Sequence, residues 1–126
     1  MFGLFRPWSS RRLTDDEWKI YTPYFPYFVL EQARIVDGYV PFWLHPNMCA
    51  LVLGRYIYFR PGSYQANTLG GIELLGHELT HVEQFLNGMR IRHYLWSCRK
   101  GYRRSKYEEL AYAKGYLIVS HYQCKN

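Results

Sequence analysis

The sequence predicts an α+β fold in which a small β-sheet packs against a central helix and a C-terminal helix. Three observations predict it: an alternating apolar run over residues 50–59, a helical apolar stripe over residues 72–86, and a last helical segment over residues 106–121. The chain has 126 residues, of which 48% are hydrophobic. That is enough for one globular domain over residues 1–126, but not for two.

The first helix is predicted just after the basic N-terminal segment. Thr14 is followed three residues later by Glu17, which is the spacing of a capping box. The two prolines between residues 23 and 26 end this helix early. Residues 28–36 fit either a strand or a helix, and the Asp-Gly pair at 37–38 ends them with a turn.

Residues 50–59 form the clearest β region. Apolar and aromatic side chains alternate on both sides of a Gly-Arg pair, as in a half-buried strand, at Leu51, Leu53, Tyr56 and Tyr58. Gly54 marks either a tight turn or a bulge.

The central helix is predicted to begin after its cap, Thr68, and to end at the Asn-Gly pair at 87–88. Its apolar residues recur at helical spacing: Ile72, Leu75, Leu79, Val82 and Leu86. Gly76 would let a neighbouring strand or a substrate come close to this helix.

This helix carries the sequence His-Glu-Leu-Thr-His, an HExxH motif. His77 and His81 are four residues apart, so both imidazoles lie on one side of the helix and can bind one Zn²⁺ ion. Glu78 can then act as a general base on a water at the metal. The motif therefore indicates a zinc hydrolase, with Glu78 as the catalytic residue.

A catalytic zinc site needs a third protein ligand. Metzincins place it in an extended HExxHxxGxxH motif, which Gln84 and Asn87 exclude here. The remaining option is a glutamate from a later helix, as in gluzincins. Glu108 is favoured because Ala111, one turn later, leaves room for two helices to approach; Glu109 is the rival. Alternatively, both acids are exposed near a helix start, where the helix dipole favours them.

Two further helices are predicted after the motif. The first is basic and covers residues 89–98. The last covers residues 106–121, and the candidates for its buried side are Tyr107, Leu110, Leu117 and Ile118.

The formal net charge is +6 and the pI is about 9.3. The basic residues concentrate at 6–12 and 90–106. The second segment is either a solvated connection between elements or the binding site of an anionic partner. Nucleic acid is the less favoured partner. The three cysteines are widely spaced, which argues against a disulfide framework. No signal peptide or membrane span is evident, so we expect a cytoplasmic protein that a dedicated secretion system could export.

Two stretches resemble the DUF4157-type zinc metallopeptidases of bacteria. That family pairs a G-x-x-I-Y-F-R-P-G strand with an LLxHELxHvxQ helix; here residues 50–62 read ALVLGRYIYFRPG and residues 74–84 read LLGHELTHVEQ. Related proteins continue with Y-R-x-N-P-x-E-x-E-A-Y. Residues 102–112 follow it, except for Ser105-Lys106 and Leu110, and keep Glu108 in register.

The resemblance covers about half of the chain, residues 51–113. It implies a minimal zincin-like fold, with a small sheet beside the HExxH helix and a glutamate-bearing helix. It also implies Zn²⁺ as cofactor, with His77, His81 and Glu108 as its ligands, and metallopeptidase activity on a peptide or protein substrate.

The predicted reaction is hydrolysis of a peptide or related amide bond. Tyr102, Tyr112 and His93 are candidate donors to the developing oxyanion. The strand at residues 56–60 could pair with an extended substrate. His45, His93 and His121 are read as ordinary residues. There are two alternatives. The first is an inactive zincin-like module that binds a partner or is a component or cargo of a secretion or phage-like particle. The second is a basic nucleic-acid binder in which the motif is incidental.

Overall fold

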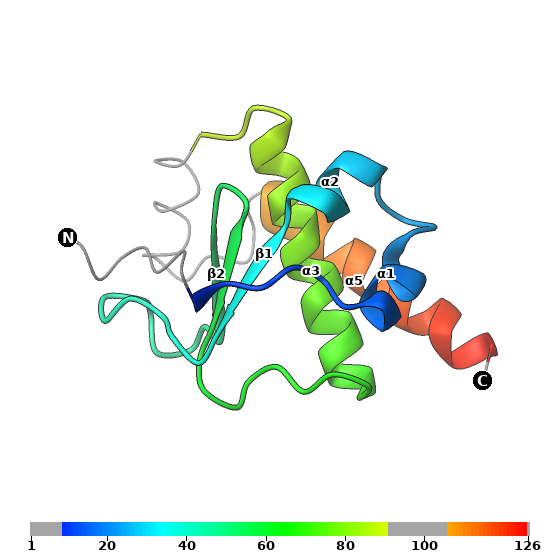
Figure 1. The fold of residues 1–126 in the computed structure, drawn as a ribbon, viewed down its shortest axis with the longest axis horizontal. Coiled ribbons are helices and arrows are strands. Elements are labelled where there is room, and N and C mark those ends of the chain that lie inside the picture. The colour runs from blue at the N-terminus through cyan, green and yellow to red at the C-terminus, as the bar shows by residue number, and fades with distance from the viewer. Residues whose placement is uncertain (1–8, 91–105, 126) are drawn as a thin grey trace.

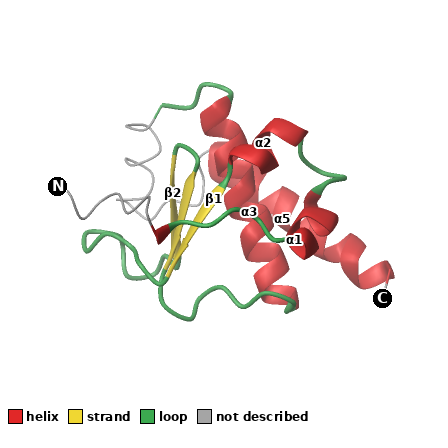
Figure 2. Cartoon of the chain, in the orientation of Figure 1, coloured by secondary structure: helices red, strands yellow, loops and turns green. Residues whose placement is uncertain are grey.

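The computed structural model describes residues 9–90 and 106–125. The elements, in chain order, are α1 (Asp15–Tyr21), α2 (Tyr27–Gln32), β1 (Arg34–Asp37), β2 (Ala50–Leu53), β3 (Tyr56–Phe59), α3 (Leu69–Leu86) and α5 (Lys106–Lys125). In Figure 1 α3 lies beside the sheet and α5 passes behind α3; Figure 2 shows the same view with helices in red and strands in yellow. The α+β class and the small sheet are confirmed.

The sheet is mixed and has the order β1-β3-β2. β3 pairs in parallel with β1 and antiparallel with β2. Gly54, with φ of +65°, lies in the two-residue turn between β2 and β3, so it marks a tight turn and not a bulge.

The expectation of a half-buried strand was wrong. All four residues of β2 and three of β3 are buried. Tyr58 meets the ring of Tyr39, and its neighbour Phe59 stacks on Tyr64. Because successive strand residues face opposite sides, these contacts cover both faces of the sheet.

Residues 28–36, which fitted either a helix or a strand, contribute to both. α2 ends at Gln32, and Ala33 has an extended backbone with ψ of 140°. The Arg34 guanidinium donates hydrogen bonds to the carbonyls of Glu31, Gln32 and Ala33, so it caps the helix whose end it directly follows. β1 then begins at Arg34.

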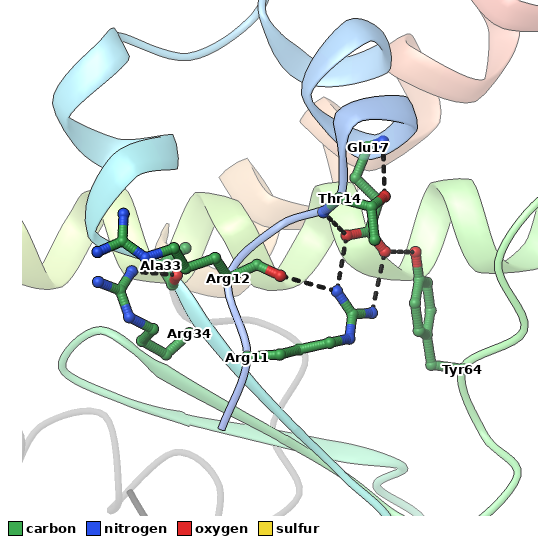
Figure 3. A network of polar contacts seen from close by, with 7 residues as sticks. All are labelled: Arg11, Arg12, Thr14, Glu17, Ala33, Arg34 and Tyr64. Carbon is green, nitrogen blue, oxygen red and sulfur yellow. Dashed lines mark hydrogen bonds and ion pairs between the residues drawn. The ribbon is translucent and has the colours of Figure 1, made fainter. Parts of the chain in front are cut away.

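The predicted capping box at α1 is confirmed, and it extends into a larger cluster around Glu17. The Glu17 carboxylate accepts hydrogen bonds from the Arg11 guanidinium at 2.9 and 3.1 Å, from the Thr14 amide at 2.8 Å and from the Tyr64 hydroxyl at 2.7 Å (Figure 3). Burial opposes its ionisation, but these donors outweigh burial and lower the pKa of Glu17. The cluster joins the N-terminal segment, α1 and the segment before α3.

We expect this cluster to make stability depend on pH. Because the folded pKa of Glu17 is lowered, its contribution is full above the ordinary value of 4.5 and is lost as the pH falls through the folded pKa. Glu17→Gln should lower the free energy of unfolding by about 2 kcal/mol at pH 7, and the difference from wild type should shrink in acid. Urea unfolding of both proteins from pH 7 to pH 3 measures it.

Asp16→Asn is the matched control, because Asp16 is an exposed acid on the same helical turn. It should change the free energy of unfolding by less than about 1 kcal/mol. A constant difference between wild type and Glu17→Gln across this pH range would contradict the prediction.

Both predicted ends of the central helix are confirmed. Thr68 caps α3 by accepting a hydrogen bond from the Gly71 amide at 3.0 Å. At the other end Asn87 is the C-cap, and Gly88 has φ of +111°, which favours glycine. The last helix is confirmed too, and it continues beyond the predicted residue 121 to Lys125.

The predicted buried side of the last helix was partly wrong. Ile118 is buried, but Leu110 and Leu117 are 55% and 45% exposed, and Tyr107 is half-buried. The buried positions follow a different stripe: Glu108, Ala111, Gly115, Ile118 and Val119. α5 thus turns a carboxylate and two small residues toward its neighbour, because they allow a closer approach than leucines would.

None of the helices within residues 9–90 and 106–125 is long and apolar enough to cross a membrane. Cys49 and Cys124 are free thiols. Most of the basic helix predicted at residues 89–98, together with Cys98, lies outside the described residues.

Candidate metal centre

Helix α3 places His77 and His81 one turn apart on its buried side. The ring centroids are 5.0 Å apart, and the side chains are 11% and 1% exposed. The apolar residues of the same helix, Ile72, Leu75, Leu79 and Val82, lie in the core. Packing therefore fixes the direction in which both imidazoles point.

Glu108 reaches both histidines from the first turn of α5. Its Oε1 lies 3.1 Å from His77 Nε2, and its Oε2 lies 3.2 Å from His81 Nε2. Glu109, the rival acid, is exposed. One ligand atom from each of His77, His81 and Glu108 lies within 4.8 Å of the others, so this group could hold a metal ion.

The donor set fits a metal ion such as zinc in its chemistry. Two imidazoles and one carboxylate are a known catalytic zinc ligand set. Each histidine Nε2 lies next to a different oxygen of Glu108, at 3.1 and 3.2 Å.

Burial and charge act in opposite directions at this centre. Burial favours the neutral form of Glu108, but its contacts with His77 and His81 outweigh burial and lower its pKa to about 2. Burial likewise lowers the pKa of His77, but the carboxylates of Glu78 and Glu108 outweigh it and raise that pKa. The carboxylate thus stays ionised beside the two imidazoles, as a cation ligand must.

Glu78 and two of the three candidate ligands open onto one cavity of about 430 Å³. Glu78 is buried in the fold, and burial raises its pKa. Tyr112 lines the same cavity, with its ring centroid 4.4 Å from that of His77 in an edge-on arrangement. The centre is therefore accessible to a small group, with an acid and a phenol beside it.

Several residues of this cavity were not predicted from the sequence. Asn47, Met48 and Cys49 line it from the segment leading into β2, Ala50 lines it from the start of β2, and Glu73 and Leu74 line it from α3. Glu73 was detectable, because it precedes His77 by four residues and so lies on the same helix face. The segment before β2 carries no comparable signal.

Close packing of α3 on α5 brings Glu108 to the histidines. A Cβ on Gly115 would lie 2.8 Å from the Glu73 carbonyl oxygen, and a Cβ on Gly76 would lie 3.0 Å from Ile118 Cδ1. The prediction that Gly76 admits a strand or a substrate was wrong, because the close neighbour is helix α5. Gly115 was missed, although a glycine inside a predicted helix is itself a signal of close approach.

The other predicted residues lie apart from the centre or outside the described residues. His45 accepts a hydrogen bond from the Asn47 amide, and His121 pairs with the Tyr24 hydroxyl. His93 and Tyr102 are not among residues 9–90 and 106–125. Pairing of a substrate with residues 56–60 was a wrong prediction, because β3 is the central strand and both of its edges are occupied.

Residues 42–88 match the family model of the eCIS core domain, a DUF4157-type domain. The matched region contains β2, β3 and α3, and so both histidines and Glu78, but it ends before Glu108. No curated protein matches the chain. No solved structure matches it.

Proposed function

We propose that this chain is a zinc-dependent hydrolase of peptide or related amide bonds. His77, His81 and Glu108 are the ligands, and Glu78 is the general base. The observation that carries the proposal is the buried His77–His81–Glu108 group, of which His77 and Glu108 line one cavity together with Glu78. A fold of the zincin kind, with a sheet beside the motif helix and a glutamate helix, belongs to this proposal.

Each residue around the centre has its own role in the proposed hydrolysis. A zinc ion bound there would polarise the substrate carbonyl and lower the pKa of water at the site toward about 7. Glu78 takes the proton of the attacking water on its carboxylate and returns it to the leaving amine. Tyr112 stands beside His77, where its hydroxyl can donate to the developing oxyanion.

The largely exposed segment that leads into β2 is the site that we propose for an extended substrate. β2 lies at the edge of the described sheet, and its first residue, Ala50, lines the cavity together with the preceding Asn47–Cys49 segment. A peptide bound along this segment would lie beside the cavity that His77, Glu78 and Glu108 line. This segment replaces the central strand, β3, as the predicted docking site.

Metal analysis tests the ligand set. We expect about one zinc ion per chain in the purified protein and a loss of most of it in His77→Ala and Glu108→Ala. His121→Ala should keep its zinc, because His121 pairs with Tyr24 away from the centre. Inductively coupled plasma mass spectrometry on dialysed protein measures the content, and equal zinc in all four proteins would overturn the ligand assignment.

A second candidate function follows from the family match. The eCIS core domain suggests an association with extracellular contractile injection systems, in which this chain would be a component or cargo. The zinc would then hold α3 and α5 together without hydrolysis. This candidate predicts that zinc removal destabilises the protein while substitution of Glu78 changes no activity.

A further inference from the structure

We infer that Gln84 is a positioning residue that sets the proton arrangement of His81 and the placement of Glu108 together. The inference rests on the proposed metal centre and begins from the two hydrogen bonds of one side-chain amide. Gln84 Oε1 lies 2.8 Å from His81 Nδ1. Gln84 Nε2 donates to the backbone carbonyl of Tyr107 at 3.1 Å.

The Tyr107 carbonyl determines which way round the Gln84 amide lies. A carbonyl oxygen only accepts hydrogen bonds, so the amide nitrogen must face Tyr107 and the amide oxygen must face His81. The amide oxygen also only accepts, so the proton of this contact belongs to His81 Nδ1. The tautomer of His81 is thus fixed by a backbone atom of another helix.

This tautomer leaves the Nε2 lone pair of neutral His81 directed at Glu108. The Nε2 atom lies 3.2 Å from Glu108 Oε2, and both side chains are buried. Two acceptors at this distance in a buried site need a cation between them, either a proton on the imidazole or a metal ion. By holding one proton on Nδ1, Gln84 leaves Nε2 as the nitrogen through which His81 can bind a metal.

The same amide also joins the two helices that supply the ligands. Gln84 lies on α3, three residues after His81, whereas Tyr107 lies on α5 and directly precedes Glu108. Its hydrogen bond to Tyr107 therefore sets the position of the first turn of α5, which contains Glu108. Loss of this one side chain should loosen one histidine ligand and the carboxylate ligand at the same time.

The tautomer can be measured directly on the full chain. Long-range ¹⁵N–¹H correlation spectra of the metal-free protein should show a proton on His81 Nδ1 in wild type, both in the neutral imidazole and in the imidazolium whose second proton faces Glu108. Gln84→Leu removes both hydrogen bonds and should give a mixture of tautomers. A wild-type His81 that carries its single proton on Nε2 and none on Nδ1 would overturn the inference, whether or not the protein binds zinc.

Zinc affinity provides the second measurement, by competition with a chromogenic chelator. Gln84→Leu should bind zinc about 10- to 100-fold more weakly than wild type. Gln84→Glu keeps an acceptor for His81 Nδ1 but has no donor for the Tyr107 carbonyl, so it should recover only part of that loss. Glu83→Gln is the matched control, because Glu83 pairs with Lys114 and should leave the affinity unchanged.

The outcomes separate this inference from the proposed function. Wild-type affinity in a folded Gln84→Leu protein would overturn the role of Gln84 and leave the metal centre standing. Absence of zinc binding in wild type would overturn the metal centre, while the tautomer spectrum would still decide the role of Gln84. If Gln84→Leu does not fold, the wild-type spectrum and Gln84→Glu keep the test complete.

Discussion

Glu78→Gln should lower the rate of hydrolysis by about 10²- to 10⁴-fold, the usual contribution of general acid–base catalysis. The amide has nearly the shape of the carboxylate but cannot accept the proton of the attacking water. Glu78 is not one of the three candidate ligands, so zinc content should stay that of wild type. Digestion of a mixed synthetic peptide library, followed by mass spectrometry, measures the cleavage, and metal analysis of the same samples measures the zinc.

Glu83→Gln is the control for this experiment. Glu83 lies on the same helix, but it pairs with Lys114 at 3.0 Å and does not line the cavity of the metal centre. It should cleave the library as wild type does. Absence of cleavage by wild type and by Glu78→Gln, with zinc present in both, would favour the injection-system module, and equal cleavage by both would overturn Glu78 as the general base.

Gly115→Val should lower the free energy of unfolding by at least about 3 kcal/mol, the upper end of the cost of overpacking. Even a Cβ at this position would lie 2.8 Å from the Glu73 carbonyl oxygen, which is a backbone atom of α3 and cannot turn away. α5 must therefore move off α3 and carry Glu108 away from the histidines. Chemical denaturation measures the loss of stability, and chelator competition measures the accompanying loss of zinc affinity.

Ala113→Val adds the same β-branched side chain to an exposed position of the same helix. Its cost should be limited to helix propensity, less than about 1 kcal/mol. If Gly115→Val were no less stable than Ala113→Val and held zinc equally well, close packing of α3 on α5 would not be what brings Glu108 to the centre.

Local sequence patterns correctly predicted helix caps, which depend on contacts between residues close together in the chain. The capping box of Thr14 and Glu17 and the cap at Thr68 are confirmed, because each depends on contacts within a few residues. Gly54 lies in a tight turn, which was one of the two alternatives for it. Residues 28–36 were ambiguous as well. A single apolar run does not tell where a helix stops and a strand starts, and here Arg34 decides it by capping α2.

Predictions that depended on contacts between residues far apart in the sequence were more often wrong. Leu110 and Leu117 were expected in the core from their hydrophobicity alone, yet both are exposed. β3 was expected to offer an edge, but strand order is a property of the whole sheet and places it in the centre. The Asn47–Ala50 segment gave no signal of its position at the cavity.

By itself the sequence determined the half of the centre that lies on one helix. Helical periodicity puts His77 and His81 on one side of α3, and their spacing needs no other part of the chain. The sequence favoured Glu108 over Glu109 through Ala111, but only the tertiary structure shows that Glu108 is the acid that meets both histidines. The choice follows from the face of α5 that packs on α3: Ala111 and Gly115 let the helices approach closely, and on that face Glu108 meets both histidines while Glu109 points to solvent.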